Sequence, residues 1–146
     1  FCVAGGRARV EGRGERVTPL PFEPRAFVLL LPPFSMSTAA VYATWDRLST
    51  RDAPSKSDDQ SGSANDLMVA ALATDERLAR WRDALEDLTG RSAQLAGSGS
   101  TWFVEGDPVT LGLGEQRLLQ LDSSVGRLVS THTVPSGWAG EPNLKA

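Results

Sequence analysis

The stretch Arg25–Leu31, which reads RAFVLLL, decides how this chain of 146 residues folds. It is a short, continuous apolar run with a proline just before it and two prolines just after it. Such a run between helix-breaking residues is typical of a strand that is covered on both of its faces. We therefore expect a sheet with this strand at its centre, and other elements of the chain packed around it.

A helix is predicted directly after the prolines. Ser35 or Ser37 can cap its first turn, and an apolar stripe follows at intervals of four and three residues. The stripe predicts that one face of this helix packs on the sheet. It consists of Val41, Trp45 and Leu48.

The segment 49–64, which reads STRDAPSKSDDQSGSA, contains almost no apolar side chain. Burial cannot offset the entropy of ordering such a segment, so we expect a mobile loop. Asn65 follows as an N-cap for a short helix that runs to Ala73.

The next helix has the clearest amphipathic pattern in the sequence. Thr74 is expected to cap it, and Gly90 is expected to end it in a left-handed conformation. Its apolar residues recur at intervals of three, four and three, which predicts one buried face. They are Leu78, Trp81, Leu85 and Leu88.

A glycine-rich turn follows in the stretch 95–104, which reads LAGSGSTWFV. We expect strands over 92–95 and 101–105, joined by this turn. The residues alone leave two interpretations open: an ordinary hairpin connection, or a nest of backbone N–H groups for a phosphate with hydroxyls of Ser98, Ser100 and Thr101 around it. The turn matches neither the Walker pattern nor the dinucleotide-binding pattern.

The two ends of the chain also read as strands. Residues 1–17 predict two strands joined at EGRGE, and 117–121 fits either a short helix or a strand. The turn residues DSSVG and the alternating RLVSTHTV that follow favour a hairpin. The predicted fold class is therefore α+β, with a mostly antiparallel sheet covered by helices on one face.

Composition excludes several classes of function. Fifteen basic and 18 acidic residues are dispersed along the chain, so a nucleic-acid partner is not expected. The longest apolar run is far shorter than a membrane span needs, and a single cysteine suits the reducing cytoplasm. No cluster with metal-ligand spacing is visible, and the lone His132 stands beside no obvious nucleophile.

Four segments in a fixed order resemble the C-terminal half of the 4-diphosphocytidyl-2-C-methyl-D-erythritol kinases, a family of the GHMP kinase superfamily that works in isoprenoid biosynthesis. The resemblance covers most of residues 1–106 and rests on the order of the segments more than on any one of them. The segments read GGRARVEGRGERVTPLP, PPFSMSTAAVY, NDLMVAAL and LAGSGSTWFVEG.

The resemblance implies that ATP phosphorylates the 2-hydroxyl of a cytidine diphosphate derivative, with Mg²⁺ as an accompanying ion for which no ligand stands out here. Tyr42 falls where the family places an aromatic ring against the cytosine, with Thr38 beside it. From the residues alone, Tyr42 is a core-edge ring and Thr38 a helix cap. The loop that would line the phosphates consists of Gly97, Ser98, Gly99, Ser100 and Thr101.

Family members are about twice as long, and their catalytic Asp, their Lys and their nucleotide loop would lie before Phe1. The resemblance thus implies a fragment that is inactive alone and needs its N-terminal half. Residues 1–24 would be trailing strands of the preceding domain and 25–146 the C-terminal domain. A helix is expected after Asp107. The alternative is a stand-alone α+β binding or interaction module without transfer chemistry.

Overall fold

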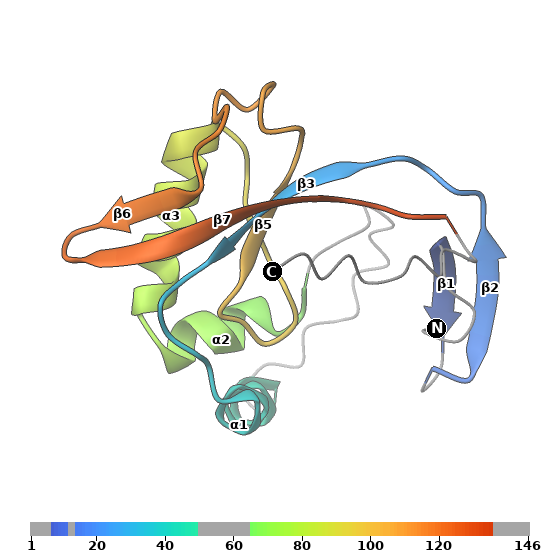
Figure 1. Cartoon of the computed structure of the whole chain (residues 1–146). Coiled ribbons are helices and arrows are strands. Elements are labelled where there is room, and N and C mark those ends of the chain that lie inside the picture. Colours follow the sequence, from blue (N-terminus) through green and yellow to red (C-terminus); the bar gives the residue numbers. More distant parts are fainter. Residues whose placement is uncertain (1–6, 12–13, 50–64, 136–146) are drawn as a thin grey trace, which may run out of the picture. The chain divides into compact units, whose positions relative to one another are not determined.

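The computed structural model describes residues 7–11, 14–49 and 65–135 (Figure 1). Three helices and seven strands form in these ranges, which confirms the α+β class. In chain order they are β1 (Arg7–Glu11), β2 (Arg16–Leu20), β3 (Ala26–Leu31), α1 (Thr38–Ser49), α2 (Met68–Thr74), α3 (Arg77–Thr89), β4 (Gln94–Leu95), β5 (Trp102–Glu105), β6 (Leu118–Leu121) and β7 (Ser124–His132).

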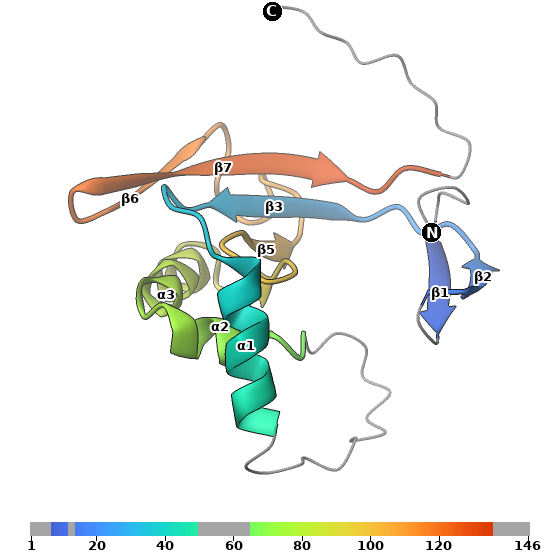
Figure 2. The same cartoon turned by 90° about the horizontal axis from the view of Figure 1, so that it is seen from below.

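The larger sheet has the strand order β4-β5-β3-β7-β6, so β3 is its central strand, as predicted. Strand β5 is antiparallel to both β3 and β4, and β6 is antiparallel to β7. Figure 2 shows β3 and β7 running in opposite directions, with all three helices on one side of the sheet. The expected antiparallel sheet with helices on one face is therefore confirmed.

Strand β3 is covered less completely than its apolar sequence predicts. Val28 and Leu30 point toward the helices and are buried, whereas the alternate residues are only half-buried. On that second face the Phe27 ring meets the Phe103 ring edge-on, with centroids 5.9 Å apart. An apolar run alone cannot distinguish a strand with two covered faces from one with a single helical cover.

Helix α3 packs as predicted. Leu78, Trp81 and Leu85 are buried, Leu88 is partly buried, and Gly90 adopts the left-handed cap with φ +63°. These side chains meet the buried residues of β3 and β5 in one core.

The predicted cap of α3 at Thr74 is wrong, because the N-cap position is Glu76, which makes no side-chain cap hydrogen bond. Thr74 is the last residue of α2 and donates its hydroxyl to the Ala70 carbonyl. Asp75 supplies a side-chain bond to the first helical residue instead, since its Oδ1 accepts the Arg77 N–H at 3.0 Å. Its two carboxylate oxygens also accept from the Arg77 guanidinium, which lowers the pKa of the Asp75 carboxyl.

The apolar stripe predicted for α1 is only partly buried. Val41 is buried, but Trp45 and Leu48 are exposed, and Thr44 takes the inner position instead. The Thr44 and Thr74 hydroxyl oxygens lie 3.2 Å apart where α1 and α2 pack together, and the Arg47 guanidinium also donates to the Thr44 oxygen, so the Thr44 hydroxyl has partners in this position. Ser37 caps α1 as predicted, because its Oγ accepts the Ala40 N–H at 3.3 Å.

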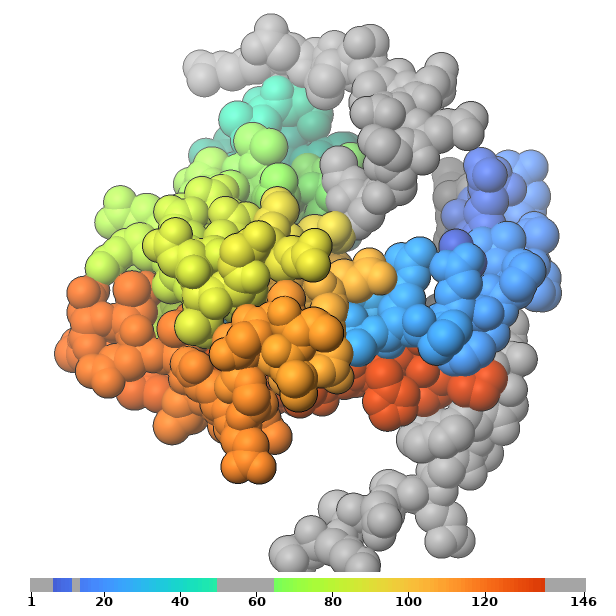
Figure 3. Space-filling model, turned by 90° about the horizontal axis from the view of Figure 1, so that it is seen from above, coloured from blue at the N-terminus to red at the C-terminus, as the bar shows by residue number. Residues whose placement is uncertain are grey.

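Strands β6 and β7 form a hairpin at one edge of this sheet, with Asp122 and Ser123 at its turn. Asp122 has φ +52°, and the segment 107–117 between β5 and β6 consists of turns, so the helix expected there is not found. Leu111 and Leu113 from this segment are buried in the core. Figure 3 shows the segment, in orange, beside the end of α3, in yellow-green.

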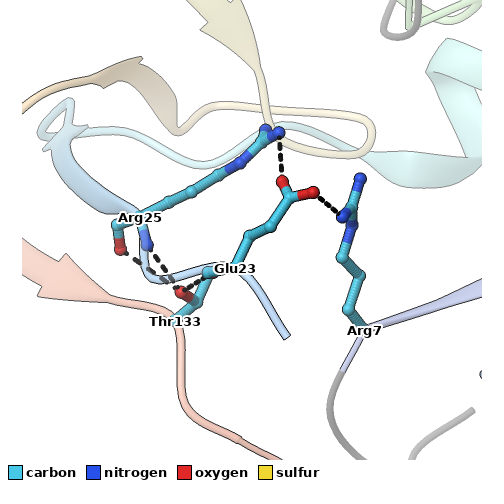
Figure 4. A network of polar contacts seen from close by, with 4 residues as sticks. All are labelled: Arg7, Glu23, Arg25 and Thr133. Atoms are coloured by element: carbon cyan, nitrogen blue, oxygen red, sulfur yellow. Dashed lines mark hydrogen bonds and ion pairs between the residues drawn. The ribbon is translucent and has the colours of Figure 1, made fainter. Parts of the chain in front are cut away.

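The described parts of 1–26 and 132–146 form a compact unit separate from 27–131. In it β1 and β2 pair antiparallel, as predicted, although part of the EGRGE turn and residues 1–6 lie outside the described ranges. Glu23 accepts from both Arg25 and Arg7, which lowers the pKa of its carboxyl, and Thr133 bonds to the backbone beside it (Figure 4). The assignment of 1–24 to a preceding domain stays a prediction, and the loop predicted for 49–64 lies outside the described residues from position 50 onward.

The contact between α3 and β7 leaves no room for a side chain at Gly126. A Cβ there would lie 2.6 Å from Trp81 Cζ3 and 3.0 Å from Leu30 Cδ1. Gly126→Ala should therefore lower the free energy of unfolding by roughly 1–3 kcal/mol, measured by urea denaturation. Ser130→Ala, at an exposed position of the same strand, is the control, and equal stability of both variants would contradict this packing.

The Asp75 carboxylate predicts a pH-dependent contribution to stability. Because Arg77 lowers its folded pKa, the contribution is present above the unfolded pKa of about 3.9 and is lost as pH falls through the folded value. Asp75→Asn should thus cost roughly 1 kcal/mol at pH 7, and the difference from wild type should shrink below about pH 4. Asp87→Asn, an exposed change on the same helix, is the control; a difference that is constant with pH would refute the ion pair.

Candidate functional site

The glycine-rich turn forms a tight hairpin connection between β4 and β5. The Ala96 N–H donates to the Thr101 carbonyl at 2.9 Å, and the Gly99 N–H donates to the Ala96 carbonyl at 3.1 Å. Gly97 has φ +58° and Gly99 has φ +92°, conformations that side chains with a Cβ adopt only at a cost. The sequence prediction of a strand-turn-strand unit is confirmed.

Two serines of this turn bind the segment that leads into α1. The Ser98 and Thr38 hydroxyl oxygens lie 2.9 Å apart, and the Ser100 hydroxyl donates to the Phe34 carbonyl at 2.6 Å. The turn and the start of α1 are 60 residues apart in sequence, yet they form one surface. Two of the segments that the sequence analysis assigned to a single site are thus brought together.

Tyr42 lies one helical turn after Thr38 on α1. Residues four apart share a face of a helix, so the ring follows the Thr38 hydroxyl along that face. Tyr42 is 51% exposed and directly follows the fully buried Val41. Trp45, three residues further on, continues the same exposed stripe.

Backbone donors of the turn point to what this surface can bind. The Gly99 N–H is used within the turn, whereas the N–H groups of Gly97, Ser98 and Ser100 have no acceptor in the described part of the chain. Free N–H groups at successive positions of a glycine-rich turn are suited to an anion such as phosphate. The role of residues 97–101 as a phosphate loop stays a prediction.

Asn65 holds this turn and was not identified as a site residue from the sequence. Its Nδ2 donates to the Leu95 carbonyl at 2.9 Å and to the Gly97 carbonyl at 2.6 Å, while its Oδ1 accepts the Leu67 N–H at 3.0 Å. An asparagine before a helix reads only as a cap. No local pattern shows that its amide reaches a turn some 30 residues away.

A chain of contacts also links the turn to α3. Phe34, whose carbonyl accepts from Ser100, lies under the Arg77 guanidinium at 4.2 Å from the ring centroid. A cavity of about 120 Å³ opens beside it, where Arg77 is paired with Asp75 and Arg80 with Asp122, so the charges balance. Its lining consists of Pro33, Phe34, Arg77, Arg80, Trp81, Leu121, Asp122 and Ser124.

Within the described ranges, no three His, Cys, Asp or Glu side chains are grouped so that they could hold a metal ion. No helix in the same part of the chain is long and apolar enough to cross a membrane.

Comparison with known proteins shows which proteins this chain is similar to. No family model matches the chain. A 4-diphosphocytidyl-2-C-methyl-D-erythritol kinase of Methylibium petroleiphilum is 32% identical over 149 residues, which cover 96% of this chain and 51% of that protein. Proteins of the same name from Moorella thermoacetica and Geobacillus kaustophilus are 51% and 54% identical over 47 and 43 residues, or 32% and 29% of this chain and 16% and 15% of theirs.

The chain spans about half the length of the Methylibium protein that it matches almost from end to end. The match confirms the resemblance found in the sequence, and its extent agrees with a fragment. The chain is therefore homologous over nearly its whole length to curated 4-diphosphocytidyl-2-C-methyl-D-erythritol kinases, and it is consistent with a C-terminal fragment of such a kinase.

Proposed function

We propose that this chain is the C-terminal half of an ATP-dependent kinase that phosphorylates the 2-hydroxyl of 4-diphosphocytidyl-2-C-methyl-D-erythritol in the cytoplasm. The observation that carries the proposal is the contact between the Thr38 and Ser98 hydroxyls, 2.9 Å apart. It joins two segments that resemble this kinase family, in a chain whose curated relatives carry that name. The stand-alone binding module is not favoured by these relatives.

The turn at 97–101 would bind the diphosphate or the phosphoryl group. Phosphoryl transfer depends mainly on positioning and on stabilising charge on the phosphate oxygens. The N–H groups of Gly97, Ser98 and Ser100, for which the described residues offer no acceptor, would supply donors that need no reorganisation when the anion arrives. Thr101 closes the turn, since its carbonyl accepts the Ala96 N–H.

Tyr42 would hold the other end of the substrate. Its exposed ring offers a face on which the cytosine can stack, one helical turn from the Thr38 hydroxyl. One wall of the site would then contact both the base and the phosphates. The catalytic Asp, the Lys and the nucleotide loop would come from an N-terminal half, to which ATP brings Mg²⁺.

The proposal is tested by joining this chain to an N-terminal half. The joined protein should transfer the γ-phosphate of ATP to 4-diphosphocytidyl-2-C-methyl-D-erythritol, followed by ADP release, and the chain alone should show no transfer. The control is the joined protein with its N-terminal catalytic Asp replaced by Asn. Transfer that persists in this control, or a joined and folded protein with no transfer, would refute the proposed reaction.

Substitution of Tyr42 tests the stacking contact. Because stacking of a base on an aromatic ring is worth about 1–3 kcal/mol, Tyr42→Ala in the joined protein should raise the KM for the cytidine substrate roughly tenfold and leave the KM for ATP unchanged. Tyr42→Phe keeps the ring and should behave like wild type. An equal rise of both KM values in Tyr42→Ala would argue against stacking.

A further inference from the structure

Asn65 makes three hydrogen bonds with one side chain. Its amide nitrogen donates to the carbonyls of Leu95 and Gly97, and its amide oxygen accepts from the N–H of Leu67 at the start of α2. The side chain is half-buried between the helix and the turn. Both amide N–H donors are therefore in use, together with one of the two acceptor positions of the oxygen.

The two carbonyls that Asn65 binds determine where the following N–H groups point. In a trans peptide the C=O and the next N–H lie on opposite sides. The Leu95–Ala96 peptide shows this arrangement. Its carbonyl accepts from Asn65, and its N–H, that of Ala96, donates across the hairpin to the Thr101 carbonyl at 2.9 Å. At Gly97 the carbonyl also faces Asn65, so the N–H of Ser98 is directed away from it and has no acceptor in the described ranges.

We propose that Asn65 is a positioning residue that orients the Gly97–Ser98 peptide, so that the Ser98 N–H is presented to a phosphate group. The inference rests on the proposed function and adds a residue outside the loop to its phosphate site. Gly97 needs such a restraint, because a glycine, here with φ +58°, can adopt several other backbone conformations. Without the Asn65 bond, nothing else among the described contacts holds the Gly97 carbonyl.

The first experiment uses Asn65→Asp in the joined kinase. Aspartate has the same shape and keeps the acceptor for the Leu67 N–H, but it cannot donate to the two carbonyls and repels them. We expect kcat to fall on the order of tenfold, which is less than the roughly 10²–10³-fold cost of removing an oriented donor, because the Ser98 N–H itself is still present. The KM for the cytidine substrate should rise as well, because the Ser98 N–H would then bind a phosphate of that substrate more weakly.

Two variants accompany this change. Asp66→Asn alters the exposed neighbouring residue, which forms no hydrogen bond with the turn among the described residues, and should keep wild-type kcat. Asn65→Ser keeps an acceptor without adding charge and should show the same kcat loss as Asn65→Asp if the aspartate variant proves unstable. Wild-type kcat in either folded Asn65 variant would overturn the proposal, because a merely structural role lowers only the melting temperature.

The second experiment separates this inference from the proposed function. Inorganic pyrophosphate is titrated into the 146-residue chain without an N-terminal half, and the amide signals of Gly97 and Ser98 are followed by NMR. Pyrophosphate should shift the Ser98 signal in wild type and in Asp66→Asn, and at least tenfold more weakly in Asn65→Asp. Equal titration of all three would refute the role of Asn65. A joined protein without kinase activity, together with the expected titration, would refute the reaction and leave Asn65 as an anion-positioning residue.

Discussion

The fold and the candidate site both depend on the burial of Trp102. Its side chain is fully buried, and its indole N–H donates to the Leu78 carbonyl of α3 at 3.1 Å. Within the sheet the same residue pairs with Leu30 of β3 and with Leu95 of β4. An indole that is placed inside a core with its N–H satisfied can occupy few alternative positions. Trp102 therefore fixes the central strand, the edge strand and the longest helix relative to one another.

This constraint reaches the turn because Thr101 directly precedes Trp102. The end of the turn enters the core with β5, while its body is held by bonds at Thr38, Phe34 and Asn65. A turn that is held by both of its strands and by hydrogen bonds to three further residues has lost most of its conformational freedom before any ligand binds. Such preorganisation is what makes oriented N–H donors useful for binding phosphate, since their ordering cost is met by folding.

The sequence predicted those features that follow from local periodicity. Leu78, Trp81 and Leu85 mark α3, the apolar run marks β3, and Gly90 marks a helix end, because each signal lies within one element. The predicted inner face of α1 was wrong at Trp45, since a threonine pair across two helices satisfied Thr44 in the interior. That pairing depends on tertiary structure, and no spacing along one helix indicates it.

In the candidate site, too, the sequence predicted the features with a local signal and missed those that depend on tertiary structure. Glycine and serine content marked the turn, and the order of four segments marked its connection with Thr38 and Tyr42. Asn65 was not predicted as part of the site, because its amide donates to carbonyls of residues that are 30 and 32 positions away in the sequence. The hydrogen bond to the Phe34 carbonyl was not predicted either, because every residue type has a backbone carbonyl and the sequence therefore does not mark this acceptor.

The chemistry of these anchors also limits what the chain can do alone. The side chains and backbone groups that bond to the turn come from Thr38, Phe34 and Asn65, and all of them are uncharged. Neutral donors can orient a phosphate group, but phosphoryl transfer also needs full charges close to the transferred oxygens. In 27–131, Arg77 and Arg80 are already paired with Asp75 and Asp122. The described surface is thus suited to holding a phosphate-bearing ligand in position, and the uncharged groups that anchor the turn do not themselves supply such charges.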